Sequence, residues 1–207
     1  MARKSSGQND WTATARGCAD NRPMNRTPTR AAALPPVLLV MWLAGCSPAL
    51  NWRSVPLPEA SITVTLPCKP DQAVRVVELA GSPVELAMAG CDADGATFAV
   101  SHAALPDPAL AGAALTHWRA AAIANLGNGA AASAVDVPYA PPGVLPLPQS
   151  VRTVVQGQRA DGGAVVAQGV WFARTVGPQM RLYHAVVYTS KPRPEVADQF
   201  FAGITLQ

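Results

Sequence analysis

VELAMAGCDADGATFAVSH, residues 84–102, is the stretch that determines the fold class of this 207-residue chain. Apolar residues alternate with others over residues 84–90 and again over 97–102, as they do in strands with one buried face. Asp94-Gly95 lies between the two runs and is typical of a type I′ turn, in which both central residues have positive φ. The stretch therefore predicts a hairpin within a meander of antiparallel strands.

Further strand signals lie on both sides of this hairpin. Each segment either alternates or is rich in Val, and Gly or Pro residues lie near its ends. The predicted strands cover residues 62–66, 73–80, 151–158, 164–174 and 181–190. Asp161-Gly162-Gly163 predicts a second hairpin, and Gly177-Pro178 predicts a turn between the last two strands.

Two segments have helical periodicity instead. Asp107-Pro108 is a favourable helix start, because Asp caps free amides and Pro fits the first turn, and Gly127 is a typical end. Apolar residues recur there at intervals of four: Leu110, Ala114, Trp118, Ala122 and Leu126. A last helix begins at Pro194, and its apolar stripe comprises Val196, Ala197, Phe200, Phe201 and Ile204, with Phe200 expected to lie deeper than Phe201. This order predicts an α+β fold, an antiparallel sheet with a mid-chain helix and a C-terminal helix packed on it.

Residues 127–150 contain five Pro and three Gly residues. This composition predicts a loop longer than packing requires. Such a loop either carries function or is a variable insertion, and the composition favours the insertion.

The start of the chain has the features of a signal peptide. Its apolar run, residues 31–43, is 13 residues long, whereas a membrane-spanning helix needs about 20. Arg26 and Arg30 precede the run, and Leu43-Ala44-Gly45-Cys46 ends it. This ending resembles the lipobox of bacterial lipoproteins. The resemblance implies a diacylglyceryl group on the Cys46 sulfur, cleavage before Cys46, and an acylated new amino terminus.

The leader sets the predicted domain boundaries. Residues 1–45 are the signal peptide, residues 46–58 a Pro-containing lipidated tether, and residues 59–207 a single α+β domain. Met24 is a plausible true start, which would make residues 1–23 a misassigned upstream extension. A genuinely long leader is the alternative.

Removing the leader changes the charge. The whole chain has a net charge of +3, but residues 1–45 hold six Lys and Arg against two Asp and Glu. Residues 46–207 hold 10 Lys and Arg against 11 Asp and Glu, which gives a net charge of −1. The composition therefore gives no electrostatic support for nucleic acid as a partner.

Cys68 and Cys91 are the cysteines left after processing. A lipoprotein crosses into an oxidising compartment, so the pair predicts one disulfide. Two free buried thiols are the alternative. A metal site is disfavoured, because cysteines 23 positions apart lack the close spacing of zinc ligands.

A second resemblance rests on Leu66-Pro67-Cys68-Lys69-Pro70 and on Asp198-Gln199-Phe200-Phe201 within the last helix. With this order of elements, the chain resembles a group of proteobacterial lipoproteins and, by layout alone, the α/β/α sandwich of the PsbP-like superfamily. PsbP-like proteins are mostly non-enzymatic, so the resemblance implies an accessory role and transfers no site residue.

No catalytic, metal or cofactor signature is present in the sequence. His102, His117 and His184 are not at metal-ligand spacing, and Ser101-His102 are strand neighbours that point to opposite faces. Arg174 and Arg181 flank the turn at Gly177-Pro178 and are candidate contacts for an anionic ligand or partner.

The function expected from these observations is a non-catalytic accessory or binding role in the cell envelope. The protein would face the periplasm, with the membrane as one partner through its lipid anchor and an envelope protein as a candidate second. Ser47 follows the lipidated cysteine, and the resemblance to lipoproteins without Asp at that place favours the outer membrane over the inner. The alternatives are a small periplasmic hydrolase using His102 or His184 and a purely structural envelope component.

Overall fold

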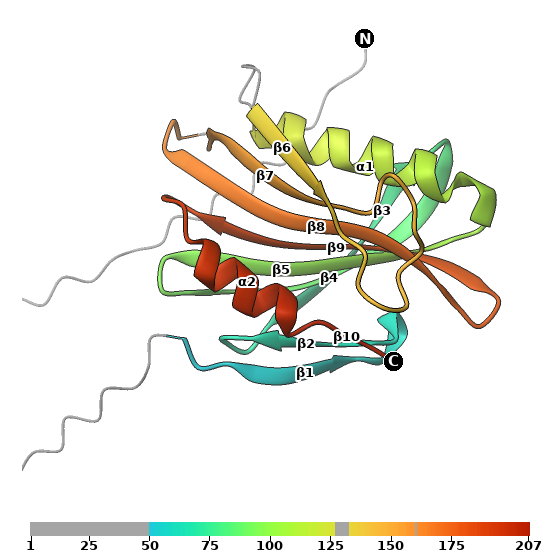
Figure 1. Cartoon of the computed structure of the whole chain (residues 1–207), viewed down its shortest axis with the longest axis horizontal. Helices are drawn as coiled ribbons and strands as arrows, with labels where there is room; N and C mark the ends of the chain where they lie inside the picture. Colours follow the sequence, from blue (N-terminus) through green and yellow to red (C-terminus); the bar gives the residue numbers. More distant parts are fainter. Residues whose placement is uncertain (1–49, 127–132, 160) are drawn as a thin grey trace, which may run out of the picture. The chain divides into compact units, whose positions relative to one another are not determined.

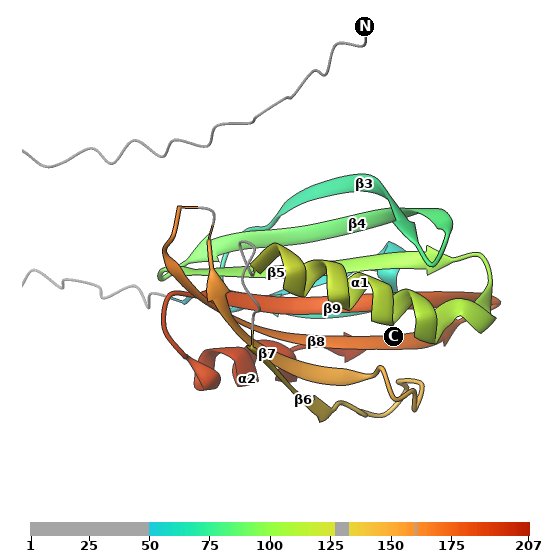
Figure 2. The ribbon, with the colours of Figure 1, turned by 90° about the horizontal axis from the view of Figure 1, so that it is seen from above.

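A seven-stranded antiparallel sheet is the largest element of the computed structural model, which describes residues 50–126, 133–159 and 161–207. Its strand order is β3-β4-β5-β9-β8-β7-β6 (Figures 1 and 2). The strands are β3 (Asp71–Leu79), β4 (Ser82–Ala93), β5 (Ala96–Leu105), β6 (Ser133–Pro138), β7 (Val151–Gln158), β8 (Ala164–Val176) and β9 (Gln179–Thr189). The predicted meander is thus one half of the sheet, and β9 joins it to the other half.

The hairpin predicted at Asp94-Gly95 is confirmed. Ala93 pairs with Ala96, and the two residues between them have φ values of 50° and 69°. Positive φ at both central positions is the requirement of a type I′ turn. The local sequence therefore determines the register of β4 against β5, and with it the face on which each side chain of β5 lies.

A smaller sheet combines two strands that come before the large sheet in the sequence with one strand that comes after it. It has the order β1-β2-β10, formed by β1 (Arg53–Leu57), β2 (Ile62–Leu66) and β10 (Thr205–Leu206), with the 3-10 turn η1 (Pro58–Ala60) between the first two. Residues 53–57, predicted as tether, are therefore part of the folded domain. Pro56 is compatible with this strand because β1 lies at the sheet edge, where a missing N–H leaves no ladder bond unmade.

Two helices lie on opposite faces of the large sheet. The mid-chain helix comprises the 3-10 turn η2 (Pro108–Leu110) and α1 (Ala111–Leu126), and Asp107 accepts a 2.9 Å hydrogen bond from the Ala109 amide. Figure 2 shows α1 running along the strands over the centre of the sheet. The second helix, α2 (Pro194–Ala202), lies beside the small sheet on the other face (Figure 1). The predicted α+β class is confirmed, with both helices packed on antiparallel sheet.

Two main cores result from this layering. Beneath α1, the largest buried side chains include Trp118, Trp171, Leu115 and Leu182. On the opposite face, β1, β2 and α2 cover a cluster that includes Phe98, Phe172, Tyr183 and Phe200. Successive residues of a strand point to opposite faces, which is why β9 contributes Leu182 to one core and Tyr183 to the other.

The segment predicted as a long loop is partly strand. Residues 133–138 form β6, the edge strand beside β7, and residues 127–132 lie outside the described part of the chain. The remainder is held by main-chain hydrogen bonds, from the Tyr139 amide to Ser150 at 2.9 Å and from the Leu145 amide to Ala173 at 2.8 Å. The Pro and Gly residues of the surrounding segment obscured the strand, although Val135 and Val137 alternate with Asp136 within it.

Among the described residues, which belong to one compact unit, every buried core residue lies between Leu57 and Phe201. This unit contains its own core, so we expect it to fold without residues 1–44. Within the described ranges, no helix is both long enough and apolar enough to cross a membrane.

Candidate functional site

The predicted pairing of Cys68 with Cys91 is confirmed. The two residues form a disulfide, with their Cα atoms 6.0 Å apart. Cys68 follows β2 of the small sheet and Cys91 lies on β4 of the large one, so the bond ties the two sheets together. The predicted lipidation site, Cys46, lies outside the described residues.

Arg174 and Arg181 are cross-strand partners at the end of the β8–β9 hairpin. Arg174 donates to the main-chain oxygens of Ser61 and Gln207, at 3.2 and 2.5 Å, and Arg181 donates to the Gln179 side chain at 3.2 Å. The Nε atom of each arginine is buried without a partner among the described residues. The Arg174 contacts join the hairpin to the small sheet. The predicted role of the two arginines as ligand contacts stays a prediction.

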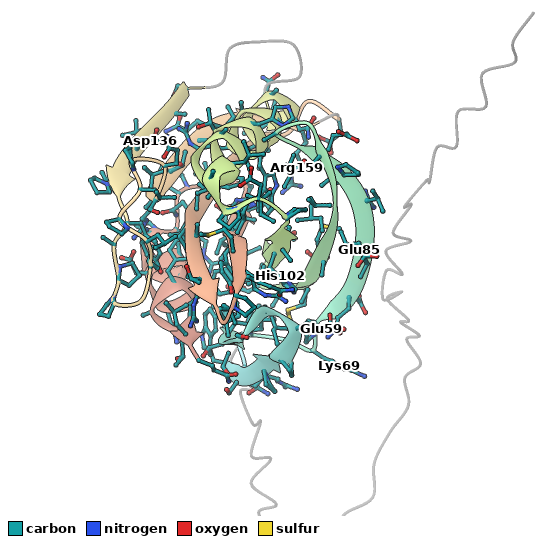
Figure 3. The ribbon with its side chains drawn as sticks, turned by 90° about the vertical axis from the view of Figure 1, so that its right-hand side faces the viewer. Glu59, Lys69, Glu85, His102, Asp136 and Arg159 are labelled. Atoms are coloured by element: carbon teal, nitrogen blue, oxygen red, sulfur yellow. A yellow bond between two sulfur atoms is a disulfide. The ribbon has the colours of Figure 1, made fainter. Side chains whose placement is uncertain are left out.

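His102 points toward the small sheet and lines a pocket of about 240 Å³ together with Glu59 of η1. Figure 3 shows the two side chains near each other at the end of the domain that faces the viewer. Burial lowers the pKa of His102, the positive charge of Arg181 lowers it further, and Glu59 opposes both effects. The other lining residues are Pro56, Leu57, Pro58, Gln72, Ala73, Val74, Ala87, Met88 and Ala89, and none of these side chains is a nucleophile. This pocket therefore holds a histidine and an acid but no Ser, Thr, Cys or Lys side chain among its described lining residues.

His184 lies on the opposite face, beneath α1. Its imidazole stacks on the Trp171 indole, with ring centroids 3.5 Å apart and planes 7° apart, and Trp118 of α1 meets both rings edge-on. Burial lowers the pKa of His184 to about 3, and no charged group offsets that effect. The side chain is therefore a neutral imidazole at physiological pH.

A groove of about 410 Å³ opens between α1 and the strands β3 and β4, and we call it the helix groove. It is lined by Val77, Glu78, Leu79, Leu86, Met88, Ser101, His117, Trp118, Ala121, Ala122, Asn125, Leu126, His184 and Tyr188. In Figure 3, the strand that carries Glu85 bends round the right-hand side of the domain while α1 lies above it. The volume lies within the range of about 300–1,000 Å³ that is usual for small-molecule sites.

One row of cross-strand neighbours forms the middle of the groove floor. Met88 of β4 pairs with Ser101 of β5, Ser101 pairs with His184 of β9, and His184 pairs with Trp171 of β8. Directly opposed residues have Cβ atoms about 4.5–5.5 Å apart, so Ser101 and His184 are immediate neighbours. Both are 7% exposed, and the structure records no side-chain hydrogen bond from either to another described residue. The floor therefore offers two uncharged polar groups between apolar walls.

The arrangement in the helix groove differs from that of a serine hydrolase. Glu78 lines the groove, but Val77 and Leu79 on either side of it pack toward α1, so the Glu78 side chain leaves β3 on the opposite face. Among the described residues no carboxylate influences the pKa of His184, and burial lowers that pKa, which makes the imidazole a weak base. Ser101 and His184 are thus placed for hydrogen bonding to a ligand, without the orienting acid of a triad.

Local sequence patterns could not have identified this pair. Alternation along β5 places Ser101 on the α1 face and His102 on the other, as expected for neighbours on a strand. The partner of Ser101, however, is 83 positions away, and the pairing depends on the β5–β9 register. Trp118 was identified as a buried residue of α1, and that prediction is confirmed by its exposed fraction of 8%.

A scan against models of known protein families and a search of curated proteins both found no match for this chain.

Proposed function

We propose that this protein is a lipid-anchored envelope protein that binds a ligand without transforming it. In this proposal, acylation at Cys46 holds the domain on the periplasmic side of the outer membrane. The support for the anchor is the Leu43-Ala44-Gly45-Cys46 sequence directly after a 13-residue apolar run. The resemblance of the chain to proteobacterial lipoproteins, and of its layout to PsbP-like proteins, favours an accessory role as well.

The observation that carries the binding role is the helix groove. Its apolar walls, its volume of about 410 Å³ and its two buried polar side chains are the usual features of a small-molecule site. A purely structural component would have no use for such an opening in its core. The groove therefore favours the binding role over the structural alternative.

A second candidate function is hydrolysis at His102, and one observation favours it. His102 shares its pocket with Glu59, so a general base and an acid are present in one place. The described lining residues include no Ser, Thr, Cys or Lys nucleophile, so the simplest mechanism has the histidine activating water directly. We rank this function below ligand binding for that reason.

The binding role is tested with N-phenyl-1-naphthylamine, a neutral probe that fluoresces in apolar surroundings. We expect residues 47–207, purified with the disulfide intact, to bind the probe. Ala121→Phe should abolish the binding, because Ala121 lines the groove. Ala124→Phe is the matched control, since Ala124 is an equally exposed residue of α1 outside the lining. Equal probe binding by both variants would contradict the proposed site.

A further inference from the structure

The helix groove is elongated along the strands. Leu86 at one end pairs with Ala103 of β5 across the sheet, and Tyr188 at the other end pairs with Thr97 of β5. Those two positions are six residues apart along β5, which corresponds to about 20 Å at the rise of a β-strand. A long, narrow ligand therefore suits the groove better than a compact one.

The polar groups lie in the middle of this length. Ser101 and His184 form the floor, and the side chains toward both ends are predominantly apolar. The Ser101 hydroxyl can donate or accept a hydrogen bond, and so can a neutral imidazole through its two nitrogens. Both side chains are 7% exposed and line the groove, so a ligand in the groove can hydrogen-bond with them.

An ionic head group at the middle of the groove would have no counter-charge on the floor. No Lys or Arg is among the described lining residues, and the side chain of the one carboxylate, Glu78, leaves β3 on the other face. The lining histidine other than His184, His117, lies on α1 rather than on the strands that form the floor. An anionic carboxylate placed beside Ser101 would be desolvated without a cation to compensate it. The recognised group is therefore uncharged, and an ester carbonyl meets this condition because it accepts hydrogen bonds without carrying charge.

We infer that the helix groove binds a neutral acyl ester, with the aliphatic chain along the apolar walls and the ester group at Ser101 and His184. This inference rests on the proposed binding function and specifies its ligand class. Trp118 forms part of the wall, so an occupying chain would contact an indole.

The test uses two ligands that share one chain, the glycerol monoester of 11-bromoundecanoic acid and the free 11-bromoundecanoate. Bromine quenches tryptophan fluorescence on contact. A Trp52→Phe background removes a tryptophan that packs on Phe98, in the core on the other side of the sheet, and leaves Trp118 and Trp171. We expect the ester to quench residues 47–207 at a concentration at least about tenfold lower than the carboxylate.

Three variants locate the bound chain. Ala121→Phe should remove quenching by the ester, because Ala121 lines the groove. Ala124→Phe should retain it, because Ala124 is outside the lining. Ser101→Ala should weaken ester binding by about three- to tenfold, the loss of one hydrogen bond.

Either of two results would overturn the inference. One is equal quenching by ester and carboxylate, and the other is an unchanged ester affinity in Ser101→Ala. If the naphthylamine probe still binds in a manner sensitive to Ala121→Phe, the proposed binding function stands and only the ligand class is wrong. If neither the probe nor the ester binds, both proposals fail.

Discussion

The His184 imidazole lies parallel to the Trp171 indole, with ring centroids 3.5 Å apart, on neighbouring strands beneath α1. Gly169 of β8 leaves room for the ring, because a Cβ at that position would stand 3.0 Å from His184 Nε2. The histidine therefore acts as an aromatic core residue and as a polar group of the groove floor. Both roles require the neutral form.

The first prediction is that His184 makes the domain less stable in acid. Its pKa is about 3 in the folded state against an ordinary value of 6.5, so the unfolded chain takes up the proton first as the pH falls. The stability from this group is complete above about pH 6.5 and is lost progressively toward pH 3, by up to about 1.4 kcal/mol per pH unit. Urea unfolding of wild type and His184→Phe between pH 7 and pH 4 measures this loss.

We expect the slope of unfolding free energy against pH to be smaller in His184→Phe than in wild type. Contributions from other titrating groups are common to both proteins and cancel in the difference. Parallel slopes for wild type and His184→Phe would show that the ring is not held neutral by burial.

The second prediction concerns Phe200 of α2. Its side chain is fully buried, 0% exposed, and meets the Phe98 ring edge-on at 5.5 Å. Phe200→Ala should therefore lower the free energy of unfolding by about 3–5 kcal/mol, the usual cost of truncating a buried Phe. Denaturant melts of residues 47–207 measure this cost. A loss below about 1 kcal/mol would mean that α2 contributes little to the core.

Phe200 also shows what sequence patterns can predict here. Consecutive Phe200 and Phe201 differ by about 100° around a helix, and Phe200 lies four positions from both Val196 and Ile204, which predicts that it is the deeper of the two. The exposed fractions of 0% and 6% for Phe200 and Phe201 agree with that order. Signals of this kind are local, because they depend only on residues within one or two turns.

Elements without a local signal were missed. β1 was predicted as tether because its Pro56 is a strand breaker in most positions, yet an edge strand accepts it. β10 has only two residues, and its pairing with β2 joins positions more than 140 apart. The groove floor was missed for the same reason, since the Ser101–His184 pair exists only once β5 and β9 are in register.

The third prediction concerns the disulfide. Cys68 and Cys91 are 23 positions apart, and the bond between them restricts the unfolded chain. Replacing both by Ser should lower the free energy of unfolding by about 2–4 kcal/mol. Reduction of wild type should give a similar loss and should not affect the double variant. If the reduced and oxidised proteins melted at the same denaturant concentration, the bond would contribute nothing to stability.

The last prediction tests the anchor. Metabolic labelling with an alkyne fatty acid should mark the wild-type chain, and Cys46→Ala should abolish both the label and cleavage before residue 46. Cys68→Ala is the matched control, because it removes a cysteine of the folded domain and should leave the label in place.

Stable anchoring requires more than one acyl chain, so the labelled wild type should sediment with outer membranes and resist salt extraction. Ser47→Asp should move it to the inner-membrane fraction, since the outer-membrane address is inferred from the absence of Asp at that position. A Cys46→Ala protein that is still labelled and still sediments with outer membranes would rule out lipidation at this cysteine.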